Sequence, residues 1–309
     1  MEFLFSVFTP TYNRANTIGR TYEYLCKQTL RSFEWIIVDD GSTDNTEEIV
    51  QKWINTNKIS IVYLKQENGG KHRAFNRAVQ IAKGEIFICL DSDDYYIETA
   101  LEIIYSYHLI HKDNPWIAGF SCNSLDLHGN LIGTSLPVDE LVVSHYNLYN
   151  SLSVKGDKGL IYYTRILKEY PFPEFENEFF VTEALVLNRI SLRYKICCIK
   201  RSLEIKDYQR DGLSSKYRHL CLRNPNGYAL YINERNYFNL SFTNYVINAA
   251  SYVRYSLFAG KSFRNIEMVC SKTVFPETLK NCLGIVPPIR VPTPPAKITA
   301  TFLMLISLF

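Results

Sequence analysis

A short apolar segment that runs directly into three acidic residues constrains the fold of this chain more than any other feature. Residues 85–90 are mostly apolar and match a strand buried on both faces, and Asp91, Asp93 and Asp94 follow at once. A buried strand cannot carry that charge, so the acids belong at its carboxyl end, where open α/β sheets bind ligands. In extended backbone Asp91 and Asp93 point the same way, and Mg²⁺ or Mn²⁺ would neutralise their repulsion. The alternative is an acidic turn in which Asp93 or Asp94 caps a helix beginning near Tyr95.

The same arrangement, an apolar strand followed by polar residues, recurs three times earlier in the chain. Residues 3–8, 34–38 and 59–64 are predicted strands, and we expect Pro10 to end the first of them. The first two clusters also have a local explanation, because Thr11 or Asn13 can cap the helix after the first, and Ser42 or Thr43 the helix after the second. The polar residues of these clusters are Thr9, Thr11, Tyr12, Asn13 and Arg14; Asp39, Asp40, Ser42 and Thr43; and Lys71, His72 and Arg73.

The alternation of predicted strands and helices favours a parallel sheet wound with right-handed crossovers. Residues 71–73 stand at the positive end of a helix predicted over residues 74–82, which is a natural place for an anion. A solvated basic turn explains these three residues equally well. The loop is not a Walker A motif, and no Gly-x-Gly-x-x-Gly occurs, which argues against a dinucleotide site.

Length and composition limit the function classes. The 309 residues suffice for one large α/β domain with an appendage or for two domains, and a net charge of +3 is too small to argue for nucleic acid as a partner. Eight scattered cysteines without a Cys-x-x-Cys pair suggest reduced thiols in the cytoplasm. We also expect no signal peptide, because the start lacks a basic region, and no membrane-spanning helix.

Four motifs resemble those of family 2 glycosyltransferases in order and spacing: residues 9–14, 38–44, 68–70 with Ala74 and Asn76, and 90–94. The resemblance covers roughly residues 1–215 and is strongest in the first hundred. It implies the GT-A fold, a mostly parallel central sheet with helices on both faces. It also implies a nucleotide-sugar donor, a divalent metal ion and inversion at the anomeric carbon.

The resemblance also implies site residues. Thr9, Tyr12 and Arg14 would surround the base, and Asp39 would accept from the N–H of uracil if the donor is a UDP-sugar. Asp91 would face the ribose and the metal shell, Asp93 would be the clearest metal ligand, and Asp94 would orient its neighbours or the donor sugar. The full set implied for the nucleotide sugar is Thr9, Pro10, Thr11, Tyr12, Arg14, Asp39, Asp40, Gly41, Lys71, Arg73, Asp91, Ser92 and Asp94.

An inverting transfer needs one base that takes the proton of the acceptor hydroxyl. In the family this base is an acid at the start of a helix in the acceptor half, often within a Glu-Asp pair. That pair is absent here, and Glu183 stands in its place behind a predicted N-cap, Thr182. Glu178 is the second candidate. The alternative for Glu183 is a purely electrostatic role at the helix dipole.

We expect three regions: a nucleotide-binding half over residues 1–95, an acceptor half over 96–215, and a helical C-terminal region over 216–309 with a proline-rich apolar tail. Residues 209–214 resemble a mobile loop that closes over the diphosphate, where Arg210 or Lys216 would reach a phosphate and Asp211 would join the metal shell. Four basic residues precede the tail: Lys261, Arg264, Lys272 and Lys280. Contact of the tail with an anionic membrane surface is therefore one expectation. A helix packed on the catalytic domain and a disordered end are the alternatives.

Together these features predict an inverting, metal-dependent glycosyltransferase in the cytoplasm or at the inner face of the membrane. It would move a sugar, UDP-linked by expectation, to a hydroxyl of a glycan or lipid-linked acceptor in cell-envelope synthesis, using Mn²⁺ or Mg²⁺. One alternative is a sugar-phosphate nucleotidyltransferase, which should show a glycine-rich loop with Arg and Lys straight after the first strand. The other is an inactive nucleotide-sugar binding module.

Overall fold

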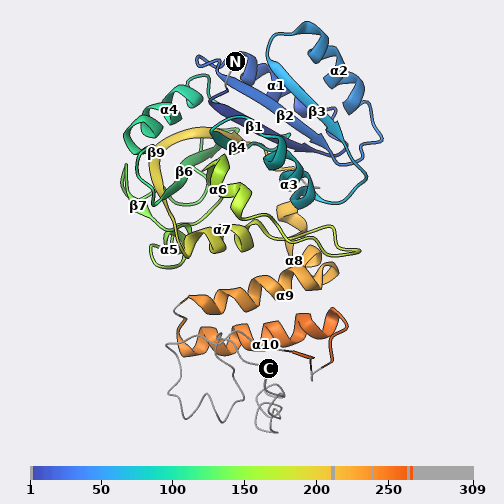
Figure 1. The fold of residues 1–309 in the computed structure, drawn as a ribbon, viewed down its shortest axis with the longest axis vertical. Coiled ribbons are helices and arrows are strands. Elements are labelled where there is room, and N and C mark those ends of the chain that lie inside the picture. Colours follow the sequence, from blue (N-terminus) through green and yellow to red (C-terminus); the bar gives the residue numbers. More distant parts are fainter. Residues whose placement is uncertain (1–2, 210–212, 239, 263–264, 267–309) are drawn as a thin grey trace. The chain divides into compact units, whose positions relative to one another are not determined.

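The computed structural model of the chain describes residues 3–209, 213–238, 240–262 and 265–266 (Figure 1). They fall into two compact units. The first consists of Met1–Glu174 and Val186–Lys216, and the second of Phe175–Leu185 and the chain from Tyr217 onward. The predicted residues Arg210, Asp211, Arg264, Lys272 and Lys280, and the apolar tail, lie outside the described residues.

The first unit begins with a parallel sheet built from β1 (Phe5–Thr11), β2 (Phe33–Asp39), β3 (Ser60–Lys65) and β4 (Ile86–Cys89), in the order β3-β2-β1-β4. The connections are α1 (Ile18–Cys26), α2 (Thr46–Thr56) and α3 (Lys71–Ile81). Helix α1 connects β1 to β2, and α2 connects β2 to β3 at the edge of the sheet, whereas α3 connects β3 to β4 on the other side of β1. Right-handed crossovers therefore place α3 on the face opposite α1 and α2, and α3 crosses in front of the strands in Figure 1.

The rest of the first unit extends this sheet with mixed strands. Next to β4 lies β8 (Gly159–Tyr163), followed by β6 (Ile117–Asp126), β9 (Lys195–Lys206) and β5 (Tyr95–Tyr96), while β7 (Val142–Val143) pairs with β9. β8 is antiparallel to both β4 and β6, and β9 runs parallel to β6. The helices here are α4 (Ala100–His111), α5 (His145–Asn150), α6 (Thr164–Glu169) and α7 (Glu183–Ser191), the last of which begins in the second unit. The α/β fold is thus confirmed, with its purely parallel part confined to β1–β4.

Pro10 does not end the first strand, contrary to the prediction. It pairs with Val38, and β1 continues to Thr11. The reason lies in the neighbouring strand: Phe8 accepts a hydrogen bond from Leu90, so Phe8 and Pro10, two positions apart, both direct their backbone groups to the β4 side. The β4 ladder has ended there, so the missing N–H of Pro10 breaks no ladder bond.

The helix expected near Tyr95 begins five residues later, at Ala100. Tyr95 and Tyr96 instead form β5, which pairs with Ile205 and Glu204 of β9. Asp94 therefore leads into a strand and caps no helix.

Aromatic packing fixes α3 against the sheet. Phe75 of α3 meets Phe8 of β1 at a centroid distance of 5.6 Å and Phe87 of β4 at 5.2 Å. Both strand rings are buried, so these contacts belong to the apolar core. They hold the first turn of α3, with Lys71, near the carboxyl ends of the strands.

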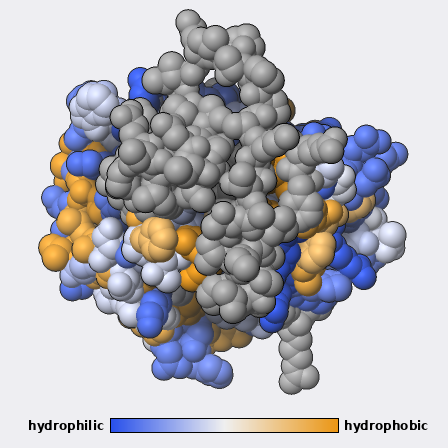
Figure 2. All heavy atoms as spheres, turned by 90° about the horizontal axis from the view of Figure 1, so that it is seen from below, coloured by the Kyte–Doolittle hydropathy of each residue, from blue (hydrophilic) through white to orange (hydrophobic). Residues whose placement is uncertain are grey.

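The second unit contains α9 (Pro225–Glu234) and α10 (Phe242–Phe258), joined by the 3-10 helix η1 (Arg235–Tyr237), and most of α8 (Leu213–Arg223). Its core includes Ala229, Ile232, Tyr252 and Val253, which pair α9 with α10. Hydrophobic and hydrophilic surface alternate in small areas on the face shown in Figure 2. Within the described residues, no helix combines the length and apolar character that crossing a membrane requires. Membrane contact stays a prediction.

Candidate functional site

The turns that follow β1 and β2 are joined by side-chain hydrogen bonds. Asn13 Oδ1 accepts from the N–H of Thr43 at 2.8 Å, and the N–H of Asn13 donates to Ser42 Oγ at 2.9 Å. Asn13 has a positive φ of 52°, a conformation that Asn adopts more readily than most residues. Beside it, the Tyr12 side chain is 47% exposed and offers a face for stacking. The two turns therefore form one platform at the carboxyl end of the sheet.

Thr9 lies in the core below this platform. Its side chain is fully buried, and its Oγ1 accepts a hydrogen bond from Trp35 Nε1 at 2.9 Å. This position does not fit the prediction that Thr9 lies around a base. Thr11 is also buried, and its hydroxyl has no hydrogen-bond partner among the described residues, whereas Pro10 is half-buried.

Asp39 is held at the end of β2 beneath the turn. Its Oδ1 accepts from the N–H of Ser42 and its Oδ2 from the hydroxyl of Tyr63, both at 2.6 Å. Burial, with the charge of Asp39, raises the pKa of Tyr63 well above its usual value, so Tyr63 donates as a neutral phenol. Asp39 is fully buried, and its predicted bond to a uracil N–H stays a prediction.

Asp40 holds the glycine-containing loop that leads into α3. Its Oδ1 accepts from Gln66 Nε2 at 2.7 Å and from the N–H of Gly69 at 2.8 Å, and its Oδ2 accepts from the N–H of Gly70 at 2.8 Å. The neighbouring Gly41 has a φ of +86°, and a Cβ there would lie 3.1 Å from the backbone nitrogen of Asn68. Asp40 and Gly41 therefore shape the loop that places Lys71.

Replacing Asp40 with Ala should lower the free energy of unfolding by about 2–4 kcal/mol, because two backbone N–H groups lose their acceptor. Urea denaturation measures this. Asp40→Asn retains one acceptor oxygen and should cost less than half as much. A loss below about 0.5 kcal/mol for the Ala variant would mean that water replaces the carboxylate at this site.

Asp91 lies beside the first residue of α3. Lys71 Nζ approaches Asp91 Oδ1 to 2.6 Å. Burial acts to raise the pKa of Asp91, but the ammonium groups of Lys71 and Lys206 outweigh it and hold that pKa below its usual value. Asp91 is therefore ionised at neutral pH.

The pKa of Asp93 is shifted in the opposite direction. Burial and the negative charge of Asp91 raise its pKa to about 6, although Arg14 and Lys71 oppose this. Asp93 thus lacks sufficient positive charge, and hard oxygens are the ligands that Mg²⁺ and Mn²⁺ prefer. No group of three His, Cys, Asp or Glu side chains in the described part of the chain is arranged to hold a metal ion. Asp91 and Asp93 offer oxygen ligands of this kind, and the metal site stays a prediction.

Asp94 points into the protein, where it is 5% exposed. Lys206 Nζ lies 3.0 Å from Asp94 Oδ2, and the N–H of Asp207 donates to Asp94 Oδ1 at 3.0 Å. Burial raises the pKa of Asp94 to about 7 against the effect of Lys206. Burial likewise opposes the charge of Lys206, but Glu204 and Asp94 raise the pKa of Lys206 well above its usual value. Of the two roles predicted for Asp94, these contacts support the orientation of its neighbours.

His72 does not contribute to the positive charge at the start of α3, although the sequence groups it with Lys71 and Arg73. It is 3% exposed, and neither ring nitrogen has a hydrogen-bond partner in the described residues. Burial, helped by Arg73, lowers the pKa of His72 to about 4. At neutral pH the charges at this helix end are therefore those of Lys71 and Arg73.

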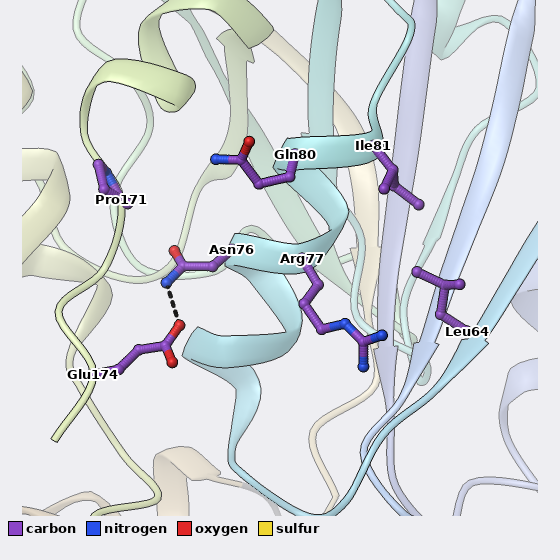
Figure 3. A pocket seen from close by; sticks show the side chains of 7 residues that line it. All are labelled: Leu64, Asn76, Arg77, Gln80, Ile81, Pro171 and Glu174. Carbon is purple, nitrogen blue, oxygen red and sulfur yellow. Dashed lines mark hydrogen bonds between the residues drawn. The ribbon is translucent and has the colours of Figure 1, made fainter. Parts of the chain in front are cut away.

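A groove of about 510 Å³ lies against α3 but contains none of the predicted site residues (Figure 3). It is lined by Leu64, Asn76, Arg77, Gln80, Ile81, Pro171 and Glu174. Asn76 Nδ2 donates to Glu174 Oε1 at 2.8 Å, and Asn76 Oδ1 accepts from the N–H of Phe172 at 2.9 Å. Asn76 thus ties the segment before residue 175 to α3. This groove could not be predicted from the sequence, because its residues come from three separate segments.

The two candidate bases belong to the second unit. Glu178 is buried; its Oε1 accepts from the N–H of Asn226 at 2.6 Å, and its Oε2 from the N–H of Gly227 at 2.9 Å. It therefore satisfies backbone donors at the start of α9, which argues against its role as a base. Glu183 is the first residue of α7 and is half-buried. Because Asp91 and Asp93 lie in the first unit, the catalytic role of Glu183 stays a prediction.

Known glycosyltransferases are similar to this chain over part of its length. The glycosyltransferase GlyG of Streptococcus pneumoniae is 35% identical over 149 residues, which are 46% of this chain and 48% of that protein. The poly(ribitol-phosphate) β-N-acetylglucosaminyltransferase TarS of Staphylococcus aureus is 32% identical over 200 residues, 61% of this chain and 34% of TarS. This chain thus spans about half the length of these curated relatives, or less.

Solved structures share the fold. The crystal structure of S. aureus TarS 1–349 with UDP-GlcNAc superposes with a TM-score of 0.59 at 23% identity, covering 82% of this chain and 72% of that one. The mannosyltransferase PcManGT from Pyrobaculum calidifontis, in complex with GDP-Man and Mn²⁺, gives 0.53 at 16% identity, covering 83% and 75%. These likenesses support the GT-A fold.

The family described as glycosyl transferase family 2 matches residues 6–125. This segment contains β1–β4, the platform of the first two turns, and Asp91 and Asp93. Over residues 6–125 the chain therefore resembles glycosyl transferase family 2, and the fold shared with the solved structures agrees with this match.

Proposed function

We propose that the protein is an inverting, metal-dependent glycosyltransferase. It takes a sugar from a nucleoside-diphosphate donor, UDP-linked, and transfers it to a hydroxyl of a cell-envelope glycan or lipid-linked glycan. The observation that carries this is the pair Asp91 and Asp93 at the carboxyl end of β4, next to Lys71. GlyG and TarS are named as glycosyltransferases, and TarS was solved with UDP-GlcNAc, which supports the donor class.

The donor half of the reaction follows from the charges at this edge. Lys71 and Arg14 supply positive charge beside Asp91 and Asp93, where the diphosphate would lie. Asp91 and Asp93 would hold Mn²⁺ or Mg²⁺, which when bound stabilises the negative charge that grows on the departing diphosphate. Tyr12 presents an exposed ring for stacking on the base.

The acceptor half requires one proton transfer. The acceptor oxygen attacks the anomeric carbon from the side opposite the diphosphate, and the bond from that carbon to the diphosphate oxygen breaks. The proton of the acceptor hydroxyl passes to the carboxylate of Glu183, and the nucleoside diphosphate leaves with the bonding electron pair. Attack from the opposite side inverts the configuration at the anomeric carbon.

Thermal unfolding with a panel of nucleotide sugars tests this function. UDP-GlcNAc or another UDP-sugar with Mn²⁺ should raise the midpoint by several degrees, because a ligand at 100 times its Kd adds about 2.7 kcal/mol. The same sugars with EDTA, and Mn²⁺ alone, are the controls and should shift it much less. Stabilisation without release of UDP when glycan acceptors are added would favour the inactive binding module. Formation of UDP-sugar from UTP and a sugar 1-phosphate would favour the nucleotidyltransferase.

A further inference from the structure

A buried asparagine between α8 and α9 contacts the segment that leads to Glu183. Asn224 is 4% exposed, and its Oδ1 accepts from the N–H of Phe179 at 2.6 Å and from the N–H of Phe180 at 3.1 Å. These donors lie four and three residues before Glu183, and all of these residues belong to the second unit. One buried side chain therefore holds the backbone shortly before the proposed base.

The amide of Asn224 is fixed in one orientation. Its Nδ2 donates to the carbonyl of Leu220 at 2.8 Å, and its backbone N–H donates to the same carbonyl at 3.0 Å. Turning the amide over would set its NH₂ group against two N–H donors and its oxygen against a carbonyl, so the side-chain hydrogen bonds would be lost. Because Leu220 lies in α8, that helix fixes the direction of the oxygen that the segment contacts.

Glu178 and Gly227 bring the same segment onto α9. The carboxylate of Glu178 accepts from N–H groups in the first turn of α9. Gly227, in that turn, allows a close approach, since a Cβ there would lie 3.0 Å from Val181 Cγ2 and 3.3 Å from the carbonyl oxygen of Phe180. The two polar side chains have separate tasks. Glu178 satisfies donors of the helix, whereas Asn224 satisfies donors of the segment itself.

The contacts continue to the residue before Glu183. Val181 and Thr182 are buried. The hydroxyl of Tyr217, in α8, donates to Thr182 Oγ1 at 3.5 Å, and the ring of Tyr217 meets that of Phe180 edge-on at a centroid distance of 5.8 Å. Helix α7 begins with Glu183 itself. The place at which this helix starts is therefore set by α8, α9 and the residue that joins them.

We propose that Asn224 is a positioning residue that holds the segment before Glu183 and thereby fixes the carboxylate that takes the proton of the acceptor hydroxyl. This proposal rests on the proposed function. A base must lie within hydrogen-bond reach of the hydroxyl, and a displacement of about 1 Å can slow transfer by about 100-fold. Without the oxygen of Asn224, two backbone N–H groups need other acceptors, so the segment moves. Donor binding should not change, because Asp91 and Asp93 belong to the first unit.

Amide hydrogen exchange tests the contact itself. In Asn224→Ala the N–H groups of Phe179 and Phe180 should exchange at least about 10-fold faster than in the wild type, because they lose their acceptor. The control is Asn248, a buried asparagine of α10 whose Nδ2 donates to the carbonyl of Ile232 at 3.3 Å. Asn248→Ala should also lower thermal stability but leave these two N–H groups protected. Unchanged exchange in a folded Asn224→Ala would overturn the proposal whether or not the protein transfers sugar.

Transfer kinetics test the positioning role. The donor is the nucleotide sugar that stabilises the wild type most in the panel above, soluble oligosaccharides are the acceptors, and the released nucleoside diphosphate is measured. Asn224→Ala should keep the wild-type stabilisation by donor with Mn²⁺ and transfer roughly 10–100-fold more slowly, whereas Asn248→Ala should transfer within about twofold of the wild type. Equal losses in the two variants would indicate a general structural defect and would overturn the proposal.

Combination with Glu183→Gln shows whether Asn224 acts through the base. In that background Asn224→Ala should slow transfer by less than about twofold, because the base is already absent. A full further loss of roughly 10–100-fold would mean that Asn224 acts independently of Glu183, contrary to the proposal.

Gly227→Ala keeps the test decisive if Asn224→Ala does not fold. It places a Cβ against Val181 and replaces a helical glycine with the best helix former, so the fold should persist. It should slow transfer by about 3–10-fold alone and by less than about twofold in combination with Glu183→Gln. A normal rate would contradict the proposal alone. A wild type that transfers sugar from no donor of the panel would overturn the proposed function, and this proposal with it.

Discussion

Replacing Glu183 with Gln is expected to leave donor binding unchanged and to slow sugar transfer by about 10²–10⁴-fold. Gln matches Glu in shape but cannot take the proton of the acceptor hydroxyl. Thermal stabilisation by UDP-sugar with Mn²⁺ should therefore equal that of the wild type, whereas release of UDP in the presence of acceptor should fall. Transfer at the normal rate would place the base elsewhere.

Glu178 provides a matched control, because it lies five residues before Glu183 and the same change can be made there. Its carboxylate accepts from backbone donors at the start of α9. Glu178→Gln should therefore lower stability by about 1–3 kcal/mol and leave the transfer rate of the folded protein near that of the wild type. Loss of transfer without loss of stability would identify Glu178 as the base instead.

The positions of the strands in the first half were predictable because each buried strand is a short apolar run with polar residues at its carboxyl end. Residues 34–38 and 85–90 show this pattern, and β2 and β4 occupy Phe33–Asp39 and Ile86–Cys89. The pattern reflects local burial, which a sequence records directly.

Features that depend on a distant partner were not predictable in the same way. Pro10 continues β1 because β4 has already ended beside it, and Tyr95 begins a strand because β9 pairs with it. Likewise the segment Phe175–Leu185 belongs to the second unit together with the chain from Tyr217 onward. In the sequence, however, this segment lies between the two segments that form the first unit. In each case the determining residue is far away along the chain.

In the candidate site, too, local features were predictable and features that depend on distant residues were not. The sequence placed Asp39, Asp40, Asp91 and Asp93 at strand ends, because charge cannot lie within a buried strand. It could not separate their roles. Asp40 bonds to backbone groups of a loop 29 and 30 residues away, and Asp94 pairs with Lys206, 112 residues away. Asp93 and Asp94 both keep an electrostatic cost in the fold, which a pattern of acids does not reveal.

Replacing Asp93 with Asn should abolish Mn²⁺-dependent donor binding and at the same time stabilise the metal-free protein. The fold raises the pKa of Asp93 to about 6 from an ordinary 3.8, so ionising this carboxyl costs stability above that pKa. Asn removes the cost and should raise the free energy of unfolding near neutral pH by about 1–2 kcal/mol, since partial exposure screens part of the full shift. Urea denaturation with EDTA, and titration with UDP-sugar and Mn²⁺, measure the two effects.

The pH dependence and a matched control separate this explanation from a general effect of removing an acid. As pH falls from about 6 towards 4, Asp93 becomes protonated in the folded wild type, so the advantage of Asn should shrink and the wild type should lose Mn²⁺ affinity. Asp139 accepts from the N–H of Lys200 at 2.8 Å and from the hydroxyl of Tyr107 at 2.7 Å, so Asp139→Asn should instead destabilise the protein by about 1 kcal/mol. If Asp93→Asn destabilised the metal-free protein as Asp139→Asn does, Asp93 would be a structural acid. Its role as a cation ligand would then be wrong.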